Sequence, residues 1–153
     1  MLKKILMGIF IVLTVLVIAF QVMLYVQAVN SRSMEVPSGH DNGQLLPCPE
    51  SPNCVSSQVP ESDSHYIAPI VDNGSTWVQL IAFLDSQDNT EQHTLDENYA
   101  HYTFSTPVMG FVDDVEFFFS ANEGVIHVRS ASRVGYGDGG TNRNRIEMIR
   151  ADL

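Results

Sequence analysis

Residues 112–132 read VDDVEFFFSANEGVIHVRSAS, and this stretch decides the fold. Two runs rich in β-branched and aromatic residues flank the polar turn at 121–124, a pattern typical of a β-hairpin. With a two-residue turn at Asn122 and Glu123, Glu116 lies directly opposite Arg129, and their charges can pair. Alternation along the strands then predicts one apolar face. That face carries Val115, Phe117, Phe119, Ile126, Val128 and Ser130.

The segments around the hairpin predict further strands and two helices. Residues 99–106 are rich in strand formers, and residues 65–71 alternate loosely enough to form a first strand. A helix is predicted after the stop and N-cap at residues 73–75, because Trp77, Leu80, Ile81 and Leu84 recur at helical spacing. A last helix is predicted over about 142–151, with Thr141 as its N-cap and a buried stripe. The stripe consists of Ile146, Ile149 and Leu153.

The N-terminus predicts a membrane anchor over residues 1–29. Lys3 and Lys4 precede an apolar run that continues to Val29, long enough to cross a bilayer. A cleaved signal peptide is the alternative, since residues 26–28 offer small residues for a peptidase. The positive-inside rule keeps the N-terminus in the cytoplasm and exports the rest. In a Gram-negative cell the chain would cross the inner (cytoplasmic) membrane once and place its domain in the periplasm.

The remaining chain divides into a polar linker at 30–44 and one exported domain at 45–153. Its expected fold class is α+β, a mostly antiparallel sheet with two helices packed on it, preceded by one N-terminal transmembrane helix. The chain has a net charge of −10, and no Lys or Arg occurs between Ser33 and Val128. Nucleic acid is therefore excluded as a partner, because its binding requires a basic surface. The expected partners are the membrane, through residues 5–29, and an anionic ligand or another envelope protein.

Two segments of the domain carry a family resemblance. Residues 46–57 read LPCPESPNCVSS, and residues 129–147 read RSASRVGYGDGGTNRNRIE. In this order they resemble the signature segments of the domain-of-unknown-function 1499 (DUF1499) family, found in bacterial envelopes and plant plastids. The resemblance implies a fold and a location but no reaction. The chain departs from the family pattern at Gly137 and Gly139, where a serine and a larger apolar residue are usual, so we expect a more flexible loop.

The second segment holds the candidate binding residues, all of which match the family pattern. They are Arg129, Arg133, Asp138, Asn142, Arg143 and Arg145. The arginines flank a glycine-rich turn that leads into a helix N-terminus, where anions are favoured. The alternative is an internal network with the acidic residues of the hairpin. We expect Arg129 and Arg133 to serve folding, and Arg143 and Arg145, in the first helical turn, to face a partner.

Cys48 and Cys54 lie six positions apart in a proline-rich loop. Export favours a disulfide between them, with a zinc site or a redox pair as alternatives. We expect no metal site, since none of the five histidines has a ligand spacing, and no cofactor. The Gly-x-Gly-x-x-Gly at 135–140 does not indicate a dinucleotide site, because the chain ends soon after it without the acidic residue that such a site needs.

The sequence favours a binding module and leaves open whether the protein is an enzyme. The leading hypothesis is a membrane-tethered envelope domain that binds an anionic group or a partner protein through the arginine-rich C-terminal segment. The alternative is an envelope hydrolase for a phosphate- or carboxylate-bearing substrate, with Asp138 and either His127 or His101 as acid–base candidates. A structural subunit of an envelope complex is the third hypothesis. The catalytic residues of such a hydrolase are otherwise unknown, since no nucleophile motif occurs.

Overall fold

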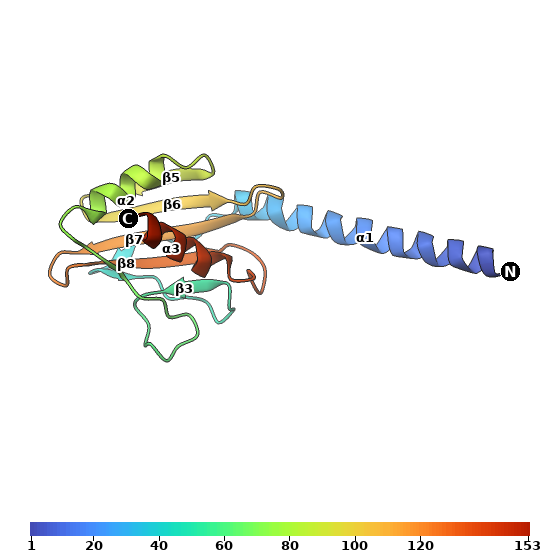
Figure 1. Ribbon diagram of the computed structural model, residues 1–153, viewed down its shortest axis with the longest axis horizontal. Helices are drawn as coiled ribbons and strands as arrows, with labels where there is room; N and C mark the ends of the chain where they lie inside the picture. The colour runs from blue at the N-terminus through green and yellow to red at the C-terminus, as the bar shows by residue number, and fades with distance from the viewer.

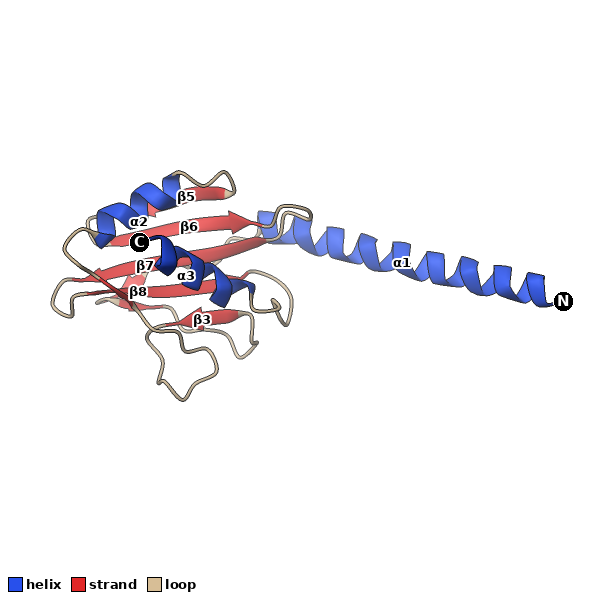
Figure 2. Cartoon of the chain, viewed as in Figure 1, coloured by secondary structure: helices blue, strands red, loops and turns tan.

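A computed structural model describes all 153 residues and shows an antiparallel sheet beside a long N-terminal helix (Figures 1 and 2). The sheet order is β3-β8-β7-β6-β5, and β4 pairs with another part of β8. The strands are β3 (Cys54–Ser56), β4 (Ile70–Val71), β5 (Thr90–Leu95), β6 (Tyr99–Ser105), β7 (Val112–Ser120) and β8 (Val125–Ser132). The helices are α1 (Leu2–Ser33), α2 (Thr76–Asp85) and α3 (Thr141–Asp152). The predicted α+β class is confirmed.

The hairpin of β7 and β8 has the predicted register. Glu116 lies opposite Arg129, and Phe117 lies opposite Val128. The ladder ends at Ser120 and Val125, one pair earlier than expected. Gly124 has a left-handed φ of 66°, which favours glycine at the end of the turn. The turn is therefore longer than the two residues predicted, but it adds one residue to each side and leaves the register unchanged.

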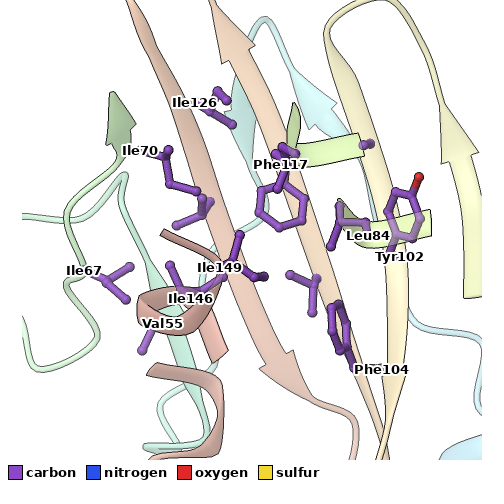
Figure 3. Packing of buried hydrophobic residues seen from close by; sticks show 14 residues of the cluster. Val55, Ile67, Ile70, Leu84, Tyr102, Phe104, Phe117, Ile126, Ile146 and Ile149 are labelled. Atoms are coloured by element: carbon purple, nitrogen blue, oxygen red, sulfur yellow. The ribbon is translucent and has the colours of Figure 1, made fainter. Parts of the chain in front are cut away.

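The core lies between one face of the sheet and the two helices α2 and α3. Figure 3 shows that Leu84 of α2 and Ile146 and Ile149 of α3 lie over the sheet. They pack in one cluster with Phe117, which points from β7 toward the helices. All four side chains are fully buried, and burial of each contributes roughly 1.5–3 kcal/mol. The predicted apolar stripes of both helices thus face this core.

Strand β5 was not predicted, because its sequence TEQHTL lacks apolar alternation. It is an edge strand that pairs with β6, with a register shift between Gln92 and Thr94. Backbone pairing, rather than side-chain burial, holds most of it in place. The strand predicted over 65–71 is also shorter than expected, since only Ile70–Val71 pair with β8.

The start of α3 differs from the prediction as well. The N-cap is Gly140, with φ 84°, and Thr141 is already the first helical residue. The Asp138 carboxylate caps the start of the helix, because its oxygens accept hydrogen bonds from the backbone N–H of Gly140 and of Asn142. The N-cap position is therefore one residue earlier than predicted, and the side chain that caps the helix comes from Asp138, because two glycines let the chain turn back over the helix end.

The long helix α1 ends inside the domain rather than before it. Ala28 and Ser31 are fully buried, and the Val112 N–H of β7 donates to Ser31 Oγ at 3.1 Å. This helix is long and apolar enough to cross a membrane, although a signal sequence near an N-terminus would have the same properties. Its C-terminal end, which includes Ala28 and Ser31, is packed against the sheet. The orientation of the helix relative to the domain is therefore fixed.

The chain after α1 covers the sheet face that α2 and α3 leave open. A small hairpin forms there from β1 (His40–Asp41) and β2 (Gln44–Leu45). The His40 ring stacks at a tilt on Phe118, with centroids 4.6 Å apart, and the Gly39 N–H donates to Glu116. Both sheet faces are therefore covered, one by an apolar core and the other by a mostly polar layer.

Candidate functional site

Three carboxylates on β7 each pair with a different arginine. The pairs are Asp113–Arg145 at 2.5 Å, Asp114–Arg133 at 2.8 Å and Glu116–Arg129 at 2.8 Å. Side chains alternate along a strand, so Asp113 faces α3 while the other two acids face the polar layer. All three acids are buried. Three of the four candidate arginines therefore already have a carboxylate partner inside the domain.

Arg145, the fifth residue of α3, points inward. Its Nη1 donates to Asn142 Oδ1 at 2.7 Å and to Ser130 Oγ at 3.0 Å, and its guanidinium lies 4.8 Å from the centre of the Phe104 ring. Asn142 is itself fully buried. The sequence placed Arg145 with Arg143 as partner-facing residues, and the structure places it instead in the buried network.

Asp114 of the polar layer accepts hydrogen bonds from an arginine and a histidine. Arg133 donates to it through Nε and Nη2, both at 2.8 Å, and His101 Nε2 lies 2.9 Å from its Oδ1. Burial alone raises the pKa of Asp114, but the hydrogen bonds from Arg133 and His101 outweigh burial and lower it to about 2. The remaining Arg133 nitrogen, Nη1, donates to the carbonyls of Ser31 and Met34 at the end of α1.

Glu116 has no exposed surface and three donors. It accepts from Arg129 Nη1 at 2.8 Å, from the Tyr99 hydroxyl at 2.8 Å and from the Gly39 N–H at 2.7 Å. Burial and the nearby Glu116 charge raise the pKa of Tyr99, which keeps its hydroxyl protonated as a donor. Arg129 Nε is buried without a partner.

The position that an anion would take at the N-terminus of α3 is filled by Asp138. Partial burial raises the pKa of its carboxyl, but hydrogen bonds from the backbone of Asn142 and Gly140 and from the Asn142 side chain hold the pKa below its usual value. Arg143 has no carboxylate partner and donates only to the Ser64 carbonyl, at 3.2 Å. It borders a small cavity of about 130 Å³ with His65 and Asp138.

A larger cavity of about 310 Å³ lies where the β8–α3 loop meets the base of α1. Leu24 and Gln27 of α1 form one wall, and Asp138 and Thr141 lie on another. The remaining lining residues are Thr106, Phe111, Val112, Asp113, Ser132, Val134, Gly135 and Gly137. The C-terminal segment thus borders a mixed polar and apolar space beside the long helix.

Residues 44–153 match the protein family described as "Protein of unknown function (DUF1499)". The chain belongs to the DUF1499 family. The match starts at β2 and includes the whole sheet with α2 and α3, while α1 precedes it. Among curated proteins, no sequence matches the chain.

The cysteines of this DUF1499 domain form the expected disulfide. Cys48 and Cys54 are joined, with Cα atoms 5.7 Å apart, and no free cysteine remains. The bond ties the proline-rich loop to the start of β3, which pairs with β8. Cys54 also borders the small cavity beside Arg143. The two family segments, far apart in sequence, are therefore adjacent in the fold.

Two histidines of the DUF1499 domain meet in a way that sequence spacing did not reveal. His93 of β5 and His101 of β6 stack with ring centres 5.1 Å apart, on a cavity of about 460 Å³ that also includes Arg133 and the chain just after α1. His127, the other acid–base candidate, is hydrogen-bonded to Glu123 at 2.6 Å. The contact of His93 with His101 depends on β5, whose polar sequence gave no strand signal. No cluster of His, Cys, Asp and Glu suited to a metal ion occurs.

Proposed function

We propose that this protein is a single-pass envelope protein whose exported domain binds a ligand at the membrane surface through its C-terminal segment, residues 129–145. The observation that carries the proposal is a pair of cavities that share Asp138. One, of about 310 Å³, combines residues of this segment with Leu24 and Gln27 of α1, and the other, of about 130 Å³, lies beside Arg143. A site built partly from the end of a membrane helix is accessible to molecules at or near the bilayer.

The arginines of this segment differ in their partners, and this difference supports one position for an anionic group. Arg129, Arg133 and Arg145 are held by buried carboxylates, so their charges are neutralised inside the fold. Arg143 is half-buried, has no such partner and borders its own cavity. We therefore assign contact with the anion to Arg143, and a structural role to the other three arginines.

The proposal is tested with the full chain purified from its own membranes in mild detergent. Phosphate- and carboxylate-bearing molecules that copurify are extracted and identified by mass spectrometry for the wild type, Arg143→Ala and Arg143→Lys. We expect one molecule to be enriched over the bulk extract, to be lost in Arg143→Ala and to be retained partly in Arg143→Lys. Absence of any enriched molecule, or equal enrichment in Arg143→Ala, contradicts the proposal.

The His101–Asp114 pair favours the hydrolase hypothesis as a second candidate. A carboxylate that accepts from His101 Nε2 leaves Nδ1 as the basic nitrogen, and His101 lines the cavity of about 460 Å³. Such a pair could take a proton from an attacking water. Asp138 fits this role less well, because both of its oxygens accept hydrogen bonds at the N-terminus of α3. A panel of phosphate and carboxylate esters tests the candidate, since activity that persists in His101→Gln excludes His101 as the base.

A further inference from the structure

We propose that the β6–β7 loop, residues 106–111, is a second membrane contact that inserts its apolar tip into the same bilayer leaflet through which α1 leaves the membrane. The loop reads Thr-Pro-Val-Met-Gly-Phe and contains no charged residue. Val108 at its tip is 93% exposed, the highest exposure of any large apolar residue outside the first residue of the chain. This contact does not depend on what the C-terminal segment binds.

The loop lies beside α1 rather than at the free end of the domain. It projects along the helix from the edge of the sheet where α1 emerges (Figure 1). Met109 borders an apolar groove on α1 together with Phe20, Leu24 and Tyr25. The same surface of the helix that would face lipid therefore continues onto the loop.

Helix geometry places one end of this groove, at Leu24 and Tyr25, at the edge of the hydrocarbon core, while the other end, at Leu13, lies inside the core. A core of roughly 30 Å takes up about 20 helical residues at about 1.5 Å each. Counted from Ile5, just after the two lysines, it ends near Leu24. Tyr25 then lies at the interface, where tyrosine is enriched. Because Met109 is level with these residues, the exposed Val108 is placed at the boundary between headgroups and acyl chains.

The loop is held in a shape that suits this environment. Backbone groups that enter lipid need internal hydrogen bonds. Arg32 at the end of α1 donates to the carbonyls of Met109, at 2.6 Å, and Gly110, at 3.0 Å. Thr106 and Phe111 close the loop by a backbone bond of 2.9 Å. The loop is thereby fixed to the helix, and the Arg32 charge lies on the headgroup side.

The charge of the domain favours a membrane contact that carries no acidic residue. The domain is strongly acidic and would be repelled by anionic lipid. The buried Ala28 and Ser31 fix the base of α1 to the sheet, so the domain cannot turn freely away from the bilayer. An apolar loop without acidic residues is the part of this surface that can approach the membrane closely.

The test uses the full chain in proteoliposomes with an environment-sensitive fluorophore on a single added cysteine, in two variants. Val108→Cys labels the loop tip, and Val71→Cys is the matched control. Val71 is an equally apolar residue, 73% exposed, in β4 at the opposite end of the sheet, beside the turn of the β7–β8 hairpin. The native cysteines do not interfere, because they are joined to each other.

We expect the label at 108 to shift to shorter wavelength and to lose fluorescence to nitroxide-bearing lipids, while a water-soluble quencher leaves it unchanged. The label at 71 should show the reverse pattern. Quenching of both labels alike by the aqueous quencher overturns the proposal. Shielding of the label at 108 from both quenchers also overturns it, because a protein rather than lipid then covers the loop.

Discussion

Arg129 and Glu116 are directly opposite each other on β8 and β7, and they form a buried pair with Nη1 and Oε2 2.8 Å apart. The pairing follows from the turn of the hairpin, because a slip of one strand by one residue would move its member of the pair to the apolar face. Glu116 receives two further donors from segments distant in sequence, Tyr99 and Gly39. The pair thus joins the hairpin to β6 and to the chain that follows α1.

Loss of one partner of this pair should destabilise the fold strongly. Arg129→Ala leaves the Glu116 carboxylate buried without its counter-charge, and we expect a loss of roughly 3–5 kcal/mol in unfolding free energy. Replacement of both residues by apolar ones of similar size should recover part of this loss, because no buried charge is then unpaired. Denaturant unfolding of both variants measures the difference, and a loss below about 1 kcal/mol for Arg129→Ala, the range of exposed pairs, would contradict the prediction.

Arg143 and Arg145 should behave differently although they are two positions apart. Arg145→Ala leaves Asp113 buried and unpaired, so we expect a loss of roughly 3–5 kcal/mol. Arg143→Ala removes only a bond to the Ser64 carbonyl, so we expect a change within about 0.5 kcal/mol, as for ordinary surface substitutions. Thermal or denaturant unfolding of the two variants decides the point. Equal effects would mean that Arg143 belongs to the structural network.

This contrast shows what the sequence could predict and what it could not. Strand alternation and turn length gave the Glu116–Arg129 pair and the core faces, because both depend on local periodicity. The inward direction of Arg145 depends on where α3 crosses the sheet, which no local pattern encodes. The His93–His101 contact also escaped prediction, since β5 is a polar edge strand held by backbone pairing. The disulfide followed from the expected export of the domain and from the short proline-rich loop that holds both cysteines.

Stability should fall at acid pH through Asp114. The pKa of its carboxyl is about 2 in the folded protein, against an ordinary value of 3.8 that applies when the chain is unfolded. The ionised carboxylate therefore stabilises the fold fully above about pH 4. This stabilisation is lost as the pH falls from about 4 to about 2, and it amounts to roughly 2 kcal/mol at most. Unfolding free energies measured from pH 5 to pH 2 should show the decline. Asp114→Asn should be less stable throughout but flatter over this interval.

The disulfide should contribute modestly to the free energy of unfolding. Closing a short loop contributes about 2 kcal/mol on the chain-entropy estimate, and the prolines reduce the gain because they already restrict the unfolded chain. We therefore expect Cys48→Ser to lower stability by no more than this amount and to keep the fold. The double variant with Cys54→Ser controls for effects of the free thiol. Thiol labelling of the denatured, unreduced wild type should find no free cysteine, and two labelled thiols would contradict the disulfide.

The chain should cross the membrane once, with its N-terminus in the cytoplasm. Lys3 and Lys4 precede the apolar run, so alkaline phosphatase fused after Leu153 should be active outside the cytoplasm. The helix should also be retained, because cleavage after Ala28 would cut within α1 and remove a fully buried residue from the contact with the sheet. The mature chain should therefore keep its first residues, as measured by intact mass. An inactive fusion would reverse the orientation, and a mature N-terminus at Val29 would identify the segment as a signal peptide.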